Sequence, residues 1–242
     1  MDNNVLTKSK IIDKIKIYEK TGEIQVTNFL DPLDIIECAS IYNKFPFCLC
    51  GGKEDAERKR LVIGTDSLEE AKDYISIIKV KSIKKLGHRD VLGSVLGLGL
   101  KRDVVGDILI NDTISYIFAN QEIANYIKNN LKQIGREKVE IEIVSIEEVE
   151  DVSEKFEIQN ITLSSLRVDS AISECYGVSR AISSKLIEAE KVKLNYKSIT
   201  NSAKAIKEGD LISVRGYGRF VIEEVIGETR KGRIRIQIKK SK

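Results

Sequence analysis

Residues 163–199 have the sequence LSSLRVDSAISECYGVSRAISSKLIEAEKVKLNYKSI, and the spacing of their apolar side chains predicts two helices followed by a strand. Four apolar side chains recur at positions i, i+3, i+4 and i+7 of the first helix: Val168, Ala171, Ile172 and Cys175. Gly177 is expected to end this helix, because glycine readily adopts the left-handed conformation of a helix C-cap. Ser179 is placed to cap the second helix with its hydroxyl group.

Two strands of this C-terminal region are predicted to be apolar on one face and mainly cationic on the other. Residues 191–197 read KVKLNYK, which places Val, Leu and Tyr196 on one face of a strand and lysines and an asparagine on the other. Residues 233–239 read RIRIQIK and repeat the pattern. Between them, a Gly-Tyr-Gly sequence at 216–218 predicts a tight hairpin.

Charge is distributed unevenly along the 242 residues. The segment from Leu163 to Lys242 holds 17 basic and 9 acidic residues, a net charge of +8, whereas the rest of the chain has a net charge of −5. The acidic stretch 147–157 precedes the basic segment and is typical of an exposed connector, so we place a domain boundary near residue 160. A basic terminal domain indicates a polyanionic partner, although a solvated basic surface gives the same composition.

The middle of the chain predicts a β-α-β-β-α-β order of elements, which is the ferredoxin-like or RRM-like arrangement. The expected elements are strand 74–83, helix 90–100, strands 107–110 and 114–118, helix 121–133, and a strand around 139–143. RRM domains stack bases on aromatic side chains of their central strands. Tyr116 and Phe118 have the spacing for such a role, but we favour packing in the core.

The N-terminal region is predicted to contain two helices, near 11–22 and 32–43, and two strands, 47–50 and 61–64. We therefore expect an α+β, multi-domain protein. Its three expected parts are a small N-terminal α+β domain at 1–72, an RRM-like domain at 73–158 and a basic C-terminal domain at 163–242.

The composition argues against membrane insertion and secretion. A membrane-spanning helix needs about 20 consecutive apolar residues, and apolar stretches such as 91–100 are short and interrupted by glycine and serine. The first residues lack the apolar core of a secretory signal. We therefore expect a cytoplasmic protein without membrane insertion.

The cysteines and the single histidine argue against metal sites and many classes of enzyme. Cys38, Cys48, Cys50 and Cys175 are too irregularly spaced for a disulfide scaffold or a zinc site, so we expect them to be buried as small apolar side chains. With His88 as the one histidine, we expect no catalytic residue, no metal and no cofactor.

The C-terminal stretch resembles the ribosomal-protein-S-four-type (S-four) RNA-binding domain. In that domain Arg-x-Asp opens the first helix, Ser-Arg opens the second, Leu-Ile lies near its end, a Val-x-x-Asn strand follows, and Gly-Asp precedes Val-Arg-Gly. The matching residues are Arg167, Asp169, Ser179, Arg180, Leu186, Ile187, Val192, Asn195, Gly209 and Asp210. The resemblance covers about the last third of the chain.

Three upstream sequences extend the likeness over nearly the whole chain: NFLDP at 28–32, GGKEDAERKR at 51–60 and GHRDVLGSVLGLGLKRDVVGDILIND at 87–112. They resemble the YlmH family of bacterial cytoplasmic proteins, in which an S-four domain follows an RRM-like domain. The resemblance implies RNA binding at the ribosome, a part in the rescue of stalled large subunits that carry peptidyl-tRNA, and an association with cell division near the septum. The implied partners are structured RNA (ribosomal RNA and tRNA), the large subunit and cell-division proteins.

An S-four-type surface is expected to neutralise RNA phosphates with Arg and Lys and to recognise the shape of the RNA backbone. The expected contact residues are Arg167, Ser179, Arg180, Lys185, Lys191, Lys193, Asn195, Lys197, Arg215 and Arg219. Asp169 and Asp210 are expected to serve capping or turn geometry. An exposed basic face without a ligand is the alternative interpretation of the same residues.

A second contact with RNA or a ribosomal protein is expected in the upstream motifs. Its candidate residues are Arg58, Lys59, Arg60, His88, Arg89, Lys101 and Arg102. Gly51-Gly52 before the first three favours either an anion-binding turn or a hairpin with a solvated basic end. His88, at the start of a helix, is expected to be neutral.

We therefore expect a non-catalytic RNA-binding factor that associates with ribosomal RNA or tRNA and acts in the quality control of stalled peptidyl-tRNA complexes. A cell-division scaffold is one alternative. An RNA-modifying enzyme targeted by its S-four domain is another, but the sequence shows neither a glycine-rich cofactor turn after a strand nor the large catalytic domain of a pseudouridine synthase.

Overall fold

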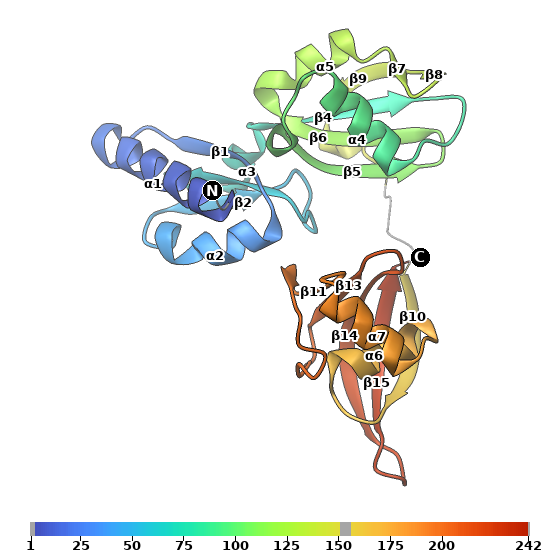
Figure 1. Cartoon of the computed structure of the whole chain (residues 1–242). Helices are drawn as coiled ribbons and strands as arrows, with labels where there is room; N and C mark the ends of the chain where they lie inside the picture. Colours follow the sequence, from blue (N-terminus) through green and yellow to red (C-terminus); the bar gives the residue numbers. More distant parts are fainter. Residues whose placement is uncertain (1–2, 151–155, 242) are drawn as a thin grey trace. The chain divides into compact units, whose positions relative to one another are not determined.

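The computed structural model describes residues 3–150 and 156–241 (Figure 1). Its contacts divide the chain into two compact units, Met1–Val152 and Ser153–Lys242. Residues 151–155, within the predicted acidic connector, lie outside the described residues. Both units combine helices with antiparallel sheets, as expected for an α+β protein of more than one domain.

The first unit begins with a three-stranded sheet of order β1-β3-β2. Its elements are α1 (Asn3–Thr21), β1 (Gln25–Leu30), α2 (Pro32–Tyr42), β2 (Phe47–Cys50), β3 (Lys59–Ile63) and α3 (Leu68–Lys72). The predicted start of α2 is confirmed: Pro32 lies in its first turn, and the Asp31 side chain accepts a hydrogen bond from Asp34 N at 3.0 Å. Buried side chains of α1 and α2, including Ile11 and Cys38, pack against β3.

A four-stranded antiparallel sheet of order β5-β6-β4-β9 completes the first unit. Its strands and helices follow the predicted β-α-β-β-α-β order, as β4 (Ile75–Lys81), α4 (His88–Gly97), β5 (Val105–Asn111), β6 (Ile114–Asn120), α5 (Ala124–Asn130) and β9 (Glu140–Val144). A short hairpin of β7 (Gln133–Ile134) and β8 (Glu137–Lys138) follows α5. The helix predicted over 121–133 is therefore shorter, because the chain turns out of it at Leu131, whose side chain is buried.

Both faces of this second sheet are covered. Helices α4 and α5 lie over one face (Figure 1), where apolar side chains such as Val91 and Ile127 pack. On the other face Tyr116 and Phe118, both 0% exposed, pack against Phe29 of β1. The expectation that these two aromatics belong to the core is confirmed, and neither ring is available to a base.

Glycines allow the N-terminal sheet region to approach this aromatic face. A Cβ atom on Gly52, which has φ +89°, would lie 2.4 Å from Cδ1 of Phe118, and one on Gly106 would lie 2.6 Å from Cε1 of Phe29. Gly51 and Gly52 are both buried. The predicted hairpin is present, because β2 pairs with β3, but its basic end is half-buried to buried rather than solvated. Close packing against Phe118 requires the second glycine, and the anion-binding turn stays a prediction.

The second unit is built on a six-stranded sheet of order β10-β15-β14-β13-β11-β12. Its elements are β10 (Phe156–Leu163), α6 (Val168–Tyr176), α7 (Arg180–Glu188), β11 (Val192–Leu194), β12 (Lys197–Ser198), β13 (Leu211–Val214), β14 (Gly218–Glu228) and β15 (Ile234–Ser241). Strand β10 runs through the boundary expected near residue 160 and pairs with β15 along its whole length. The predicted ranges of the three domains stay predictions.

Local signals in the second unit correspond closely to the structure. Gly177 ends α6 with φ +63°, and the Ser179 hydroxyl accepts a hydrogen bond from Ile182 N at the start of α7. The strand predicted over 191–197 is interrupted, however, because Asn195 and Tyr196 have positive φ and form a two-residue turn between β11 and β12. Tyr196 therefore does not extend the apolar face of β11.

Candidate RNA-binding surface

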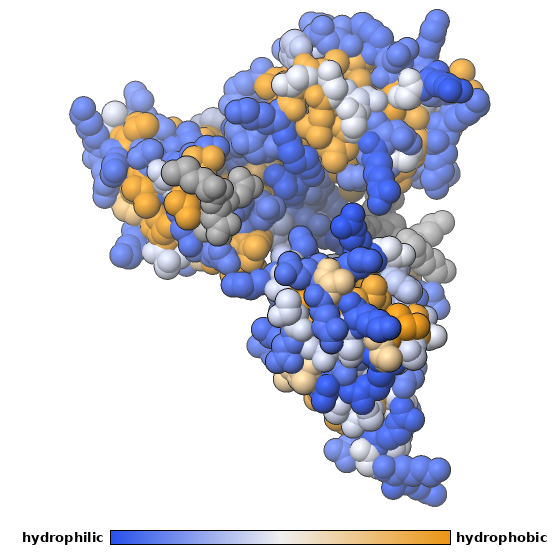
Figure 2. All heavy atoms as spheres, in the orientation of Figure 1, coloured by the Kyte–Doolittle hydropathy of each residue, from blue (hydrophilic) through white to orange (hydrophobic). Residues whose placement is uncertain are grey.

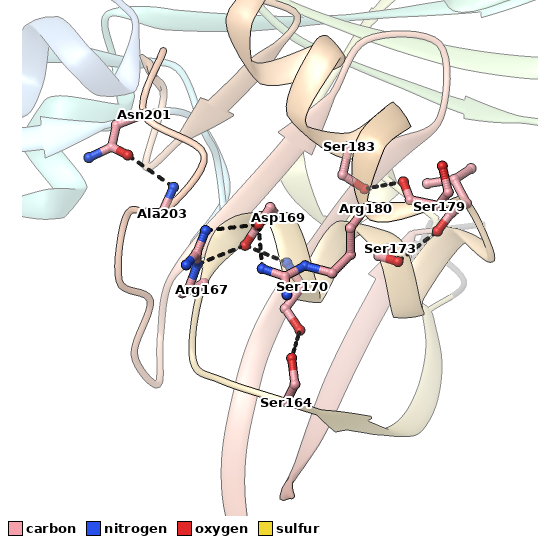
Figure 3. Close-up of polar contacts among 11 residues, drawn as sticks. Ser164, Arg167, Asp169, Ser170, Ser173, Ser179, Arg180, Ser183, Asn201 and Ala203 are labelled. Carbon is pink, nitrogen blue, oxygen red and sulfur yellow. Dashed lines mark hydrogen bonds and ion pairs between the residues drawn. The ribbon is translucent and has the colours of Figure 1, made fainter.

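Two arginines meet one aspartate at the beginning of α6 and α7 (Figure 3). Arg167 donates from Nε to Asp169 Oδ1 at 3.1 Å and from Nη2 to Oδ2 at 3.0 Å. Arg180 donates from Nη2 to the same Oδ2 at 2.6 Å. We call these three residues the arginine cluster.

The arginine cluster has a buried carboxylate and two accessible cations. The Asp169 side chain is 3% exposed, against 37% for Arg167 and 49% for Arg180. Burial acts to raise the pKa of Asp169, but the hydrogen bonds and charges of Arg180 and Arg167 outweigh it, and the pKa lies below its usual value. The carboxylate therefore stays ionised at neutral pH and orients two guanidinium groups whose combined charge exceeds its own.

The structure gives Asp169 more than the capping role expected of it. Its Oδ1 does accept a hydrogen bond from Ser170 N at 2.9 Å, within the first turn of α6. Its main bonds, however, go to the two arginines. A guanidinium fixed in this way retains N–H donors for phosphate oxygens, and its orientation is set before a ligand arrives.

A loop after β12 adds a cation that the sequence analysis did not single out. Val168 N donates to Lys204 O at 3.0 Å, and Arg167 forms an isolated β-bridge with Ala205. The backbone of Lys204 therefore lies beside the arginine cluster, and this lysine is exposed. The available signal was the segment 197–207, which contains three lysines and no acidic residue.

The lysines near β11 lie on the other face of the sheet. Val192 and Leu194 are buried in the same core as α6 and α7, so strand alternation directs Lys193 away from the helices. An open groove of about 750 Å³ runs across this face. Its cations are Lys191, Lys193, Arg215 and Arg219, and we call it the sheet groove. Six of the ten predicted contact residues thus fall into two groups, two in the arginine cluster and four in the sheet groove.

Asn195 holds a turn. Its Nδ2 donates to Asp210 Oδ1 at 2.8 Å, and its Oδ1 accepts from Leu211 N at 2.9 Å. Asp210 also accepts from Lys207 N at 2.8 Å, which confirms its expected role in turn geometry. The side chain of Asn195 is therefore used in turn geometry, and its contact with RNA stays a prediction. Lys185 on α7 and Lys197 on β12 are exposed.

The two upstream motifs meet at Asp107. Its carboxylate accepts hydrogen bonds from the backbone N–H groups of Glu57 at 2.8 Å and Arg58 at 3.1 Å. Arg58 donates to Phe29 O at 3.0 Å, and burial lowers its pKa. Arg102 donates to Gly106 O at 3.2 Å, and burial together with the charge of Arg58 lowers its pKa to about 10.

The prediction that Arg60 contributes to the second contact is wrong. It is 2% exposed, its Nε donates to Thr27 O at 2.7 Å, and its guanidinium group also reaches Tyr74 O and the Glu122 carboxylate. A buried side chain that joins β1, β3 and the 3-10 helix η2 (Gln121–Ile123) inside the unit is not available to RNA. Among the other candidates for the second contact, three are exposed and three are half-buried. The exposed ones are His88, Arg89 and Lys101, and the half-buried ones are Arg58, Lys59 and Arg102.

His88 is the first residue of α4, which confirms its expected position at the start of a helix. Surrounding protein atoms and the charge of Arg102 lower the pKa of His88, and Asp107 opposes this only in part. The neutral form is therefore favoured, in agreement with the expectation.

Comparisons with known proteins show which family the chain is similar to. Residues 70–148 match the family model described as "Putative RNA-binding domain in YlmH". A protein of Bacillus subtilis (strain 168) named "Ribosome-associated protein quality control protein P2" is 28% identical over 234 residues, which cover 94% of this chain and 91% of the relative. The chain is similar to proteins of the YlmH family.

A solved structure supports the fold of the chain. It is titled "Cell division protein ylmH from Streptococcus pneumoniae" and is 22% identical, with a TM-score of 0.53 over 62% of this chain and 96% of that one. The family model spans β4 to β9, so the four-stranded sheet with the buried Tyr116 and Phe118 is the part that carries the family's domain. The likeness of residues 163–242 to an S-four domain stays a prediction.

Other expected features concern cysteines, membranes and metals. Cys38, Cys50 and Cys175 are buried, and Cys48 is half-buried, so three of the four occupy the predicted environment. Within residues 3–150 and 156–241, no helix is long and apolar enough to span a membrane. In the same residues, no group of three or more His, Cys, Asp or Glu side chains is placed to hold a metal ion.

Proposed function

We propose that this protein is a non-catalytic, cytoplasmic RNA-binding factor. Its RNA is structured RNA of the large ribosomal subunit, tRNA, or both. We propose that it acts in the quality control of stalled peptidyl-tRNA complexes, and the name of the Bacillus subtilis relative supports a role in ribosome-associated quality control. The observation that carries the proposal is the arginine cluster, in which a buried carboxylate orients two accessible guanidinium groups.

The charge of the second unit suits a partner rich in phosphate. Residues 163–242 have a net charge of +8, and in the view of Figure 2 the surface of this unit is mostly hydrophilic. Arginine and lysine bind phosphates and release counterions, so affinity falls as salt rises. An A-form helix hides its major groove, so recognition depends on the backbone and 2′-hydroxyl groups.

The proposal is tested with purified large subunits and tRNA. Arg180→Ala is expected to weaken binding and to lower the slope of log affinity against log salt by about one, as for loss of one phosphate contact. Arg180→Lys keeps the charge but not the planar guanidinium group with its several N–H donors, and we expect an intermediate affinity. Arg230→Ala is the matched control, because Arg230 is an exposed arginine of the same unit in the turn between β14 and β15.

Two results would contradict the proposal. One is binding of Arg180→Ala with unchanged affinity and salt slope. The other is the appearance of new modifications when the protein is incubated with ribosomal RNA and S-adenosylmethionine, since these would indicate an enzyme.

A further inference from the structure

An exposed tyrosine lies in the sheet groove. Tyr217, in the turn between β13 and β14, is 43% exposed and lines the groove together with its cations. The groove volume of about 750 Å³ lies within the range of roughly 300–1,000 Å³ that is typical of sites for small organic groups. In the sequence, this residue stands out only as the middle of the Gly-Tyr-Gly hairpin signal.

The ring of Tyr217 is held from within the second unit. Its centroid lies 5.3 Å from that of Tyr176, which in turn packs edge to face against Phe220 at 5.8 Å. Lys240 Nζ lies 4.7 Å from the centroid of the Tyr176 ring. The flanking glycines have φ of +90° and +114°, so the turn takes a path that other residues rarely adopt. The exposed ring is therefore supported at a defined position.

The positive charge around the Tyr217 ring favours an anionic ligand. Among the described residues, the side chains of Lys191, Lys193 and Arg215 make no hydrogen bond or ion pair. Glu190 is the single carboxylate that lines the groove. Lys193 lies opposite Ser213 and Ser213 opposite Arg219, so small and cationic side chains form a row beside the turn.

We propose that the sheet groove binds an unpaired nucleotide of the RNA, with its base stacked on Tyr217 and its flanking phosphates bound by Lys191, Lys193 and Arg215. This inference rests on the proposed function and makes it more specific. A duplex backbone alone would use the cations but not the ring, because paired bases are stacked on each other. An unpaired base presents its flat face, which aromatic side chains bind with little regard to sequence.

The test compares two RNA duplexes of the same stem sequence, one fully paired and one with a single bulged 2-aminopurine. The full-length protein is expected to bind the bulged duplex more tightly and to quench the fluorescence of the bulged base. Tyr217→Leu is expected to reduce affinity for the bulged duplex about tenfold and to leave affinity for the paired duplex unchanged. Tyr217→Phe keeps the ring and should retain both the preference and the quenching.

Tyr126→Leu is the matched control, because Tyr126 on α5 is 47% exposed and lies in the other unit. It should behave like the unaltered protein. Equal affinity of the unaltered protein for both duplexes, or an equal loss on both in Tyr217→Leu, would overturn the inference. If either result were found but Arg180→Ala still weakened binding to large subunits or tRNA, the proposed function would stand. Binding of neither duplex would also overturn the inference, and the proposed function would then be decided by the measurement with large subunits and tRNA.

Discussion

Asp169→Asn is expected to destabilise the second unit by about 2 kcal/mol at pH 7. The carboxylate accepts three hydrogen bonds from Arg167 and Arg180 and one from Ser170 N. A hydrogen bond to a charged group contributes about 1.5–3 kcal/mol when shielded. Both arginines are more than a third exposed, so water can solvate them after the substitution, and we assign about 1 kcal/mol to each. The bond from Ser170 N survives, since the asparagine oxygen accepts it.

The loss of stability should depend on pH in a defined direction. The pKa of Asp169 in the folded protein lies below its ordinary value of 3.8. Its contribution is therefore complete above that ordinary value and disappears as pH falls through the lowered folded-state pKa. The stability difference between the unaltered protein and Asp169→Asn should be constant near neutral pH and should shrink in strong acid.

The measurement is equilibrium urea unfolding followed by circular dichroism at pH 7 and at pH values below 3.8. Amide hydrogen exchange at pH 7 would assign the effect to α6 and α7, where about 2 kcal/mol corresponds to roughly 30-fold faster exchange. An unchanged midpoint at pH 7 would refute the stabilising role of the cluster. A difference that stayed constant in acid would show that the effect does not arise from the carboxylate charge.

Two further predictions concern the first unit. Phe118→Ala should destabilise this unit by about 3–5 kcal/mol, because it empties a fully buried site. Its affinity for RNA, measured under conditions in which the protein is folded, should not change. A loss of RNA binding without a loss of stability would contradict the packing role of Phe118. Arg60→Met should lower the urea midpoint by an amount equivalent to about 1–3 kcal/mol, since it leaves Thr27 O without a buried donor, and RNA affinity should again be unchanged.

The features that the sequence predicted well depend on neighbours a few residues apart. The helix α6 follows from apolar spacing and from Gly177, and α7 from the cap at Ser179, because each signal acts within one or two turns. Asp169 carried the same kind of local signal, and its capping bond to Ser170 is present. Its larger role required α6 and α7 to place Arg167 and Arg180 around it, which no local pattern shows.

The features that the sequence did not predict depend on contacts between distant segments. Arg60 lies in a basic run that is typical of a surface, yet it is buried because Thr27 O and the Glu122 carboxylate supply its partners. Strand β10 begins at the end of an acidic stretch. It forms a strand because it pairs with β15, more than 70 residues later in the chain. Tyr196 continues an alternating pattern, but positive φ at this residue ends the strand.

The burial of the aromatic face of the four-stranded sheet decides where a base can stack. Exposing Phe29, Tyr116 and Phe118 together would return three large apolar side chains to water, at about 1.5–3 kcal/mol each, or roughly 5–9 kcal/mol in all. Stacking one base returns about 1–3 kcal/mol, so the exchange is unfavourable. Tyr217 is already 43% exposed and is held by Tyr176, so a base can stack there without this cost. Base contacts are therefore expected at the sheet groove of the second unit, while the aromatic residues of the family-matched domain stabilise the first.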